Sequence, residues 1–331
     1  MRRGMVVIAA ALVGAWHASA AQSRVLIVTG LGAEPKYQTL FMSLGARMAA
    51  AMHDRFLVPD SNIVWLGEDS TAKPKWYAGR STAQNISHQF DRLASRAKPN
   101  EQIVIALIGH GSGEGEDTKF NIPGPDLTAR DFAAMLGRLP SQRIAFLDLT
   151  SASGDALSVL SGPNRIVVTS TKSAYERNES QFARFFVEAL DKPGVADVDK
   201  DGRVSLLEAY RYAVTETRRV YSNNERLVTE HSQLDDDGNG KGTDLPDGHS
   251  AGDGLVSRRF FFDASAMETK LATGDPQLAK LYADRFAVED QIDALKQKKA
   301  TMTEDRFYTE LETLLVNLAR TQREIRKKEG R

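Results

Sequence analysis

Short apolar runs alternate with segments of helical periodicity over the first 190 residues of the chain. The apolar runs are rich in branched side chains, as is typical of strands buried on both faces, and they cover residues 24–29, 62–66, 103–108, 143–148 and 165–170. Between them, apolar residues recur every three or four positions at residues 37–53, 81–97, 128–136 and 181–190. This alternation predicts an α/β domain in which helices cover both faces of a mostly parallel sheet.

One histidine stands directly after the third apolar run. Residues 109–113 read Gly-His-Gly-Ser-Gly, so the loop presents His110 at the carboxyl end of the predicted strand. Open α/β sheets bind ligands outside the carboxyl ends of their strands. His110 is therefore a candidate functional residue, and the alternative is that the glycines form a turn in which His110 has only a structural role.

The last 58 residues, 274–331, are charged and aliphatic and predict two helices. Apolar residues recur there at spacings of three and four. In the first helix these are Leu278, Leu281, Val288, Ile292 and Leu295, with Arg285 at one position of the stripe. In the second helix they are Phe307, Leu311, Leu314, Leu318 and Ile325, with Thr321 also in register. Narrow stripes on two neighbouring helices favour an antiparallel coiled-coil hairpin. Such a hairpin either folds back on the main domain or protrudes as an arm that binds a partner protein or a second copy of the chain.

A twelve-residue segment at 197–208 has the ligand spacing of an EF-hand calcium loop. The ligands expected from this spacing are Asp197, Asp199, Asp201, the backbone carbonyl of Arg203, Ser205 and Glu208. Gly202 occupies the position of the sharp turn. Hard oxygen ligands without histidine favour Ca²⁺ over a transition metal. The alternative is an acidic surface turn that binds nothing.

A second acidic loop follows at residues 234–240. Asp235, Asp237 and Asn239 have ligand spacing and Gly240 stands at the turn, but the twelfth position is Pro246, which has no ligating side chain. This loop is either a half-site completed from elsewhere in the fold or a polar loop without metal.

The first 20 residues have the pattern of a secretory signal peptide. Arg2 and Arg3 precede an apolar core at residues 5–16, and residues 18–20 read Ala-Ser-Ala. We therefore expect a secreted or periplasmic protein. No later stretch has the roughly 18 apolar residues that a membrane span needs. The chain contains no cysteine, so its stability in an oxidising compartment must come from core packing, ions or partners rather than disulfides.

The charge of the chain gives no reason to expect a polyanionic partner. The sequence has 43 basic and 44 acidic residues, a net charge of −1. Removal of the predicted signal peptide, which carries two arginines, leaves −3. Such a balance provides no electrostatic argument for binding to nucleic acid or to an anionic membrane.

Taken together, these motifs resemble the caspase/legumain-like cysteine peptidases, in particular secreted bacterial relatives of legumain. In that family an apolar strand ends in His-Gly, as at His110-Gly111 here, and a later strand ends in a motif of the form Ala-Cys-x-Ser-Gly. The strand at 143–148 is followed by Thr150-Ser-Ala-Ser-Gly154, which puts Ser151 at the position of the nucleophilic cysteine. Further similar segments are residues 168–173, 176–182 and 229–237 and the EF-hand-like insert.

The resemblance covers roughly residues 24–260 and implies a caspase-like α/β fold. With it, the domains expected are a signal peptide at 1–20, a caspase-like domain at 21–192, a calcium-loop region continuing it at 193–265, and a helical hairpin at 274–331. The resemblance also implies that His110 and Ser151 occupy the two catalytic positions.

The serine at the cysteine position changes the expected chemistry. A thiolate forms near neutral pH, whereas a serine hydroxyl needs a base in direct hydrogen-bond contact. Three hypotheses follow: a calcium-stabilised pseudopeptidase that binds a protein or peptide at its groove or arm, a hydrolase in which His110 activates Ser151, and a structural envelope protein that acts through its coiled-coil arm. We expect the first.

Overall fold

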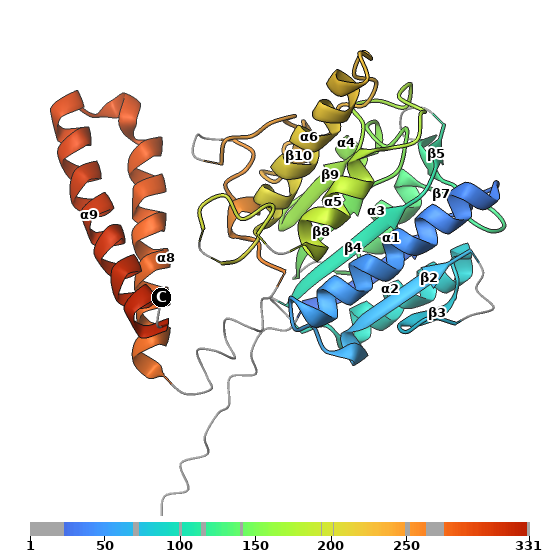
Figure 1. Cartoon of the computed structure of the whole chain (residues 1–331), viewed down its shortest axis with the longest axis horizontal. Helices are drawn as coiled ribbons and strands as arrows, with labels where there is room; N and C mark the ends of the chain where they lie inside the picture. The colour runs from blue at the N-terminus through green and yellow to red at the C-terminus, as the bar shows by residue number, and fades with distance from the viewer. Residues whose placement is uncertain are drawn as a thin grey trace, which may run out of the picture.

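A seven-stranded sheet forms the centre of the computed structural model, in the order β10-β9-β8-β4-β1-β2-β3 (Figure 1). Its strands are β1 (Ser23–Thr29), β2 (Ile63–Gly67), β3 (Tyr77–Arg80), β4 (Gln102–Ile108), β8 (Arg143–Asp148), β9 (Arg165–Thr169) and β10 (Gln233–Asp235). Neighbouring strands pair in parallel except that β10 runs antiparallel to β9 at one edge. The predicted mostly parallel α/β sheet is confirmed, and it is consistent with the fold that the resemblance implies.

The structure describes residues 23–68, 73–98, 101–113, 117–139, 142–192, 194–200, 202–248, 252–262 and 275–329. The predicted signal peptide at residues 1–20 and the expected calcium ligand Asp201 lie outside these ranges.

Helices cover both faces of the sheet, as the sequence pattern predicts. On one face lie α1 (Pro35–Asp54), α5 (Phe182–Asp191) and α6 (Leu206–Asn223), and on the other lie α2 (Ala83–Arg96), α3 (Ala129–Leu136) and α4 (Ala156–Leu160) (Figure 1). Successive residues of β1 point to opposite faces, so Val25 and Ile27 join the first core and Leu26 and Val28 the second. Because both faces are buried, the strands read as continuous apolar runs.

Side-chain caps fix where two of these helices begin. In α3 the Thr128 side chain accepts a hydrogen bond from the Asp131 N–H at 3.1 Å, and the Asp131 carboxylate accepts one from the Thr128 N–H at 2.8 Å. Ser205 and Glu208 form the same reciprocal capping box at the start of α6. Each box satisfies N–H groups that the first helical turn leaves unpaired.

Three two-residue strands form a small antiparallel sheet in the order β5-β6-β7. They are β5 (Gly111–Ser112), β6 (Lys119–Phe120) and β7 (Leu127–Thr128). Because β5 follows β4 directly, this small sheet holds the His110 loop at the carboxyl edge of the large one.

The chain ends in a hairpin of two long helices, α8 (Pro276–Gln297) and α9 (Glu304–Glu329), which lie antiparallel beside the α/β domain (Figure 1). Phe307, Ile325, Ile292 and Leu295 are buried in it. Arg285, which interrupts the apolar stripe, is 5% exposed and binds Glu289 at 3.0 Å. No helix in the described part of the chain is both long and apolar enough to cross a membrane.

Candidate functional site

The loops that carry His110 and Ser151 leave the sheet side by side. Strands β4 and β8 are parallel neighbours in which Leu107 pairs with Asp148, and the Leu149 N–H donates to the Leu107 carbonyl at 2.9 Å. The parallel register therefore brings His110 and Ser151, which are 41 positions apart in the chain, to one edge of the sheet.

Ser151 is buried, with 1% of its surface exposed. Its Oγ accepts a hydrogen bond from the Gly111 N–H at 3.3 Å. No hydrogen bond among the described residues joins this hydroxyl to His110. In this arrangement the oxygen of Ser151 is held by a donor, not by a base that could remove its proton.

The His110 ring packs against the first turns of α1. Its centroid lies 4.7 Å from the ring of Tyr37 and 5.0 Å from that of Phe41, and both contacts are edge-on. None of the hydrogen bonds formed by the described residues involves its ring nitrogens. Burial lowers the pKa of His110, opposed by the negative charges of Glu179 and Glu34. The imidazole is therefore neutral at pH 7 and sits in an aromatic contact.

A buried carboxyl group lies just before Ser151. Asp148 is 6% exposed, and burial raises its pKa to about 7, opposed by hydrogen bonds from Thr150. The Thr150 hydroxyl donates to Asp148 Oδ1 at 2.6 Å and the Thr150 N–H donates to the same oxygen at 3.3 Å. This pair braces the turn after β8 and makes no hydrogen bond to His110 among the described residues.

A second histidine at the same edge is a feature that the sequence analysis did not single out as a site. Because β10 is antiparallel to β9, the residues preceding β10 lie at the carboxyl edge, and they include His231. His231 Nδ1 lies 2.6 Å from Glu176 Oε1, and the His231 N–H donates to Glu176 Oε2 at 2.9 Å. The Glu176 carbonyl accepts from the N–H of Ala152, next to Ser151, at 2.8 Å.

The Glu176–His231 pair therefore holds the residue whose carbonyl binds the turn that carries Ser151. Ala152 itself is buried and has φ of +56°. A left-handed conformation is costly for alanine and persists where surrounding contacts enforce it. The only sequence signal for this pair is that both residues fall in segments that resemble the peptidase family.

Two of the most exposed large apolar side chains belong to the segments that this pair joins. Tyr175 is 74% exposed and Leu227 is 88% exposed. Tyr175 precedes Glu176, and Leu227 lies in the loop that leads to His231. Asn178 Nδ2 donates to Thr229 Oγ1 at 3.2 Å, so the two segments meet at the surface as well. Apolar side chains presented in this way are typical of contact surfaces.

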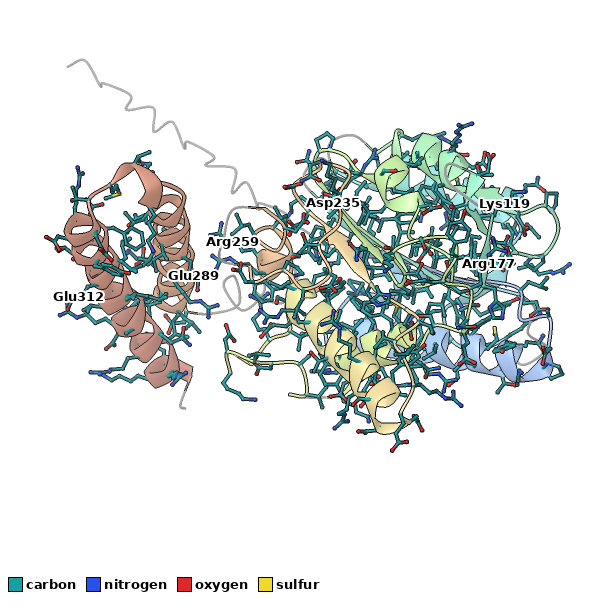
Figure 2. The ribbon with its side chains drawn as sticks, turned by 90° about the horizontal axis from the view of Figure 1, so that it is seen from above. Lys119, Arg177, Asp235, Arg259, Glu289 and Glu312 are labelled. Atoms are coloured by element: carbon teal, nitrogen blue, oxygen red, sulfur yellow. The ribbon has the colours of Figure 1, made fainter. Side chains whose placement is uncertain are left out.

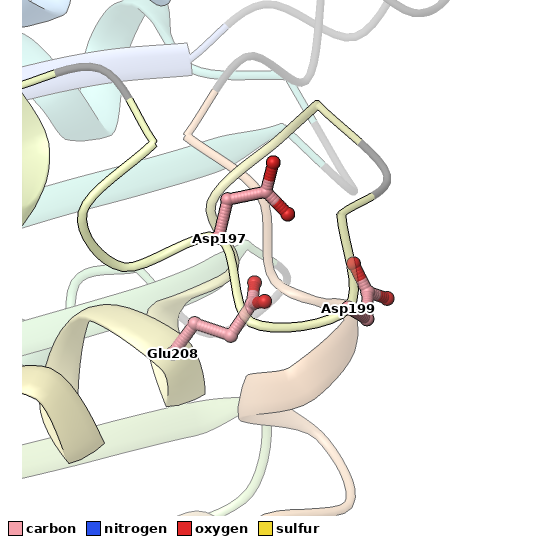
Figure 3. A group of neighbouring side chains, drawn as sticks. All are labelled: Asp197, Asp199 and Glu208. Atoms are coloured by element: carbon pink, nitrogen blue, oxygen red, sulfur yellow. The ribbon is translucent and has the colours of Figure 1, made fainter.

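Three of the expected calcium ligands converge where the acidic loop meets the first turn of α6 (Figure 3). Asp197, Asp199 and Glu208 each place a carboxylate oxygen within 4.8 Å of the other two. The Gly202 N–H donates to Asp197 Oδ2 at 3.1 Å, and Gly202 has φ of +87°, which glycine adopts without strain. This group could hold a metal ion, and its carboxylate oxygens suit a hard cation.

Two further expected ligands, Ser205 and Arg203, lie among the described residues. Ser205 Oγ donates to Glu208 Oε2 at 2.8 Å, while Glu208 Oε1 accepts from the Val198 N–H at 2.9 Å. The Arg203 guanidinium lies over the Phe261 ring, 3.7 Å from its centroid. Because the side chain contacts Phe261, only the backbone carbonyl of Arg203 is available as the ligand that the EF-hand spacing predicts. Asp201 lies outside the described residues.

The second acidic loop gains a carboxylate from a later segment. Asp253 joins Asp235 and Asp237 in a group whose oxygens lie within 4.8 Å of one another. Asp235 accepts hydrogen bonds from the N–H groups of Gly238 at 2.9 Å and Gly240 at 2.8 Å. The expected ligand Asn239 instead donates through Nδ2 to Asp237 Oδ2 at 2.9 Å. The group agrees with a half-site completed from elsewhere, although its oxygens already accept hydrogen bonds from the protein.

A pocket of about 450 Å³ lies between the first acidic loop and α8. Asp199 and Glu208 line it from the loop, and Arg285 and Glu289 line it from α8. Burial raises the pKa of Glu289, opposed by Arg285, Arg258 and Arg259. Figure 2 shows Glu289 on the side of the hairpin toward Arg259 and Glu312 on the far side. The hairpin therefore adjoins the domain through α8.

Comparisons with known proteins give no family. No family model matches the chain, and no curated protein matches it. Among solved structures, protein GSU0716 from Geobacter sulfurreducens is similar over 59% of this chain and 89% of that chain, with 10% sequence identity and a TM-score of 0.39. A likeness at this level carries no argument about activity.

Proposed function

We propose that this chain is an exported, calcium-binding homologue of the caspase/legumain-like peptidases that does not hydrolyse peptides and acts by binding another protein. The observation that carries the proposal is the resting geometry of the two catalytic positions. Ser151 Oγ accepts from the Gly111 N–H while the His110 ring lies edge-on to Tyr37 and Phe41. Neither side chain is arranged to activate the other.

This geometry lacks what a serine nucleophile requires. A serine nucleophile depends on a base within about 3 Å of its hydroxyl, and on a third group that orients the base. The described residues supply no such hydrogen bond to the His110 ring. Ser151 is also 1% exposed, so a scissile carbonyl could reach its oxygen only if the loop moved. Loss of one member of a catalytic pair typically removes several orders of magnitude in rate.

Calcium at residues 197–208 fits the donor set. Asp197, Asp199 and Glu208 are hard oxygen donors already within 4.8 Å of one another, and they follow EF-hand spacing. Bound Ca²⁺ would bring the loop between α5 and α6 into a fixed conformation. Since α6 packs on α5 against one face of the sheet, the ion would stabilise the fold without entering any reaction.

Protein binding is supported at the carboxyl edge of the sheet. Tyr175 and Leu227 are exposed there, on segments held together by the Glu176–His231 pair. Many protein interaction surfaces consist of exposed aromatic and aliphatic side chains on segments that are held in place by other contacts. We assign the partner site to this edge, where a peptidase of this fold would hold its substrate.

The test is peptide hydrolysis by the chain without residues 1–20. A degenerate peptide library is incubated with the unsubstituted protein and with Ser151→Ala, with Ca²⁺ present, and cleavage is measured by mass spectrometry. We expect no cleavage above buffer from either protein. Cleavage by the unsubstituted protein that disappears in Ser151→Ala would overturn the proposal in favour of a serine-dependent hydrolase using Ser151 and His110.

A further inference from the structure

The outer side of α9 presents apolar side chains between residues 308 and 316. Tyr308 is 50% exposed, Leu315 is 48% exposed and Val316 is 42% exposed. Phe307 and Ile325 of the same helix are buried, at 4% and 1%. The helix therefore has one apolar side covered within the hairpin and a second that is exposed to solvent, and Figure 2 places Glu312 of α9 away from the α/β domain.

Tyr308 and Leu315 belong to a regular seam, and Val316 lies beside it. Residues 308, 312, 315, 319, 322 and 326 alternate spacings of four and three, the repeat of a coiled-coil contact. Ala319 and Leu315 stand at its centre, and Tyr308 and Arg326 near its ends. Its other positions differ from those buried against α8, such as Phe307 and Ile325, whereas Gln322 Oε1 accepts a hydrogen bond from Arg285 Nη1 of α8 at 3.4 Å. Three of the six seam residues are apolar, namely Tyr308, Leu315 and Ala319, and another helix laid along the seam would cover them.

The charge along α9 changes sign at the same central point. Residues 304–316 contain four acidic residues and one basic residue, a net charge of −3, whereas residues 317–329 contain five basic and two acidic residues, a net charge of +3. A helix that is acidic in one half and basic in the other is complementary to a second copy of itself in the antiparallel orientation.

We propose that the seam on α9 is a self-association surface, on which two copies of this chain pair in antiparallel orientation. The two-fold axis crosses the seam midway between Leu315 and Ala319. In this register Leu315 of each copy faces Ala319 of the other, and the small alanine permits close approach. Tyr308 faces Arg326, a cation–π pairing. Glu312 of each copy adjoins Arg323 of the other, while Gln322 keeps its hydrogen bond to Arg285 within its own hairpin. Together the two hairpins make a four-helix bundle.

The parallel alternative is excluded by charge. It would set the two acidic halves against each other and the two basic halves likewise, and like charges across an interface are costly. The seam from residue 308 to residue 326 is about 27 Å long at 1.5 Å per residue. A contact of this length lies at the small end of specific interfaces, so we expect a weak dimer that dissociates on dilution.

The proposal is independent of catalysis and of calcium, and sedimentation equilibrium tests it. The chain without residues 1–20 is measured at up to about 100 μM, in ~0.05 M and ~0.5 M salt. We expect a monomer–dimer equilibrium that weakens at the higher salt concentration. Leu315→Glu should weaken association at least tenfold. Asn317→Glu adds the same charge to an exposed position of α9 outside the seam, and it should leave association nearly unchanged.

A charge exchange distinguishes self-association from binding to a different protein. Glu312→Lys and Arg323→Glu should each weaken the dimer, and the two together should restore it, because each copy then carries both exchanged charges. Circular dichroism of every variant checks that α9 remains helical. A monomer at 100 μM in low salt, or a dimer unaffected by Leu315→Glu, would overturn the proposal.

Discussion

The hydroxyl oxygen of Ser151 accepts a hydrogen bond from the backbone N–H of Gly111, 3.3 Å away. This contact joins the loops that follow β4 and β8. A Cβ atom at Gly111 would lie 2.2 Å from the Ser151 carbonyl oxygen and 3.0 Å from Thr150 Oγ1. The two loops therefore approach so closely that residue 111 has no room for a side chain.

Gly111→Ala should destabilise the domain by about 2 kcal/mol or more, because backbone atoms of the Ser151 loop must move to accept the methyl group. Gly137→Ala is the matched control. Gly137 has φ of −59° and its added Cβ would meet nothing closer than 3.3 Å, so this variant should stay within about 0.5 kcal/mol of the unsubstituted protein or gain slightly. Chemical denaturation measures both, and equal effects would contradict the close approach.

The buried Asp148 predicts a pH dependence of stability. Its pKa is about 7 in the folded protein and about 4 in an unfolded chain. Below pH ~4 both states are protonated and its stabilising contribution is complete. Between these values the unfolded state releases its proton first, so the free energy of unfolding falls as pH rises, by an amount on the order of 3–4 kcal/mol, and then levels off.

Asp148→Asn isolates this effect, because the amide oxygen still accepts from Thr150 but does not titrate. Unfolding is measured by denaturant at intervals from pH 4 to pH 8 for both proteins. Relative to the variant, the unsubstituted protein should be most stable at pH 4 and lose that advantage through pH 7. A constant difference across this range would show that Asp148 does not titrate as described.

Calcium should raise the melting temperature of the protein through the loop at 197–208. A ligand at 100 times its Kd adds about 2.7 kcal/mol. In Glu208→Gln the amide still serves the capping box with Ser205, but the bidentate carboxylate is lost. The variant should melt near the unsubstituted protein in chelator and gain little from Ca²⁺. No calorimetric heat with Ca²⁺, and no effect of chelator, would refute the site.

Glu230 should prove important for stability although it lies outside every predicted site. It is 5% exposed, and its carboxylate accepts hydrogen bonds from the N–H groups of Gln181 and Phe182 and from the hydroxyl of Ser180. It thus caps α5 from a distant part of the chain. Glu230→Ala leaves these donors unpaired and should cost about 2–3 kcal/mol. Glu230→Gln, which keeps acceptor oxygen, should cost less, and equal losses would argue against the cap.

The sheet could be predicted from sequence because its central strands are buried on both faces. A short continuous apolar run such as that of β4, rich in branched residues, is typical of a strand buried on both faces. The edge strands gave no such signal. β3 (Tyr77–Arg80) is half exposed and contains Gly79 with φ of +137°, and β10 has three residues that pair antiparallel with β9. Their pairing depends on long-range contacts rather than on local periodicity.

The positions of His110 and Ser151 in the fold could be predicted from sequence, but their contacts could not. The loop lengths after β4 and β8 place His110 and Ser151 at one edge. Their orientation could not be read from sequence, since it depends on rings from α1 and on the Gly111 N–H. His231 and Glu176 are 55 residues apart and meet only because β10 reverses direction. Asp253 likewise reaches Asp235 from a segment with no ligand spacing of its own.

The most direct test of the absence of catalysis is labelling with a fluorophosphonate probe, which reacts with a serine only when a base has activated it. The unsubstituted protein, Ser151→Ala and a heat-unfolded sample are labelled side by side, with and without Ca²⁺. Our account predicts that the folded unsubstituted protein takes up no more probe than Ser151→Ala. Stoichiometric labelling that requires the folded protein and disappears in Ser151→Ala would contradict it.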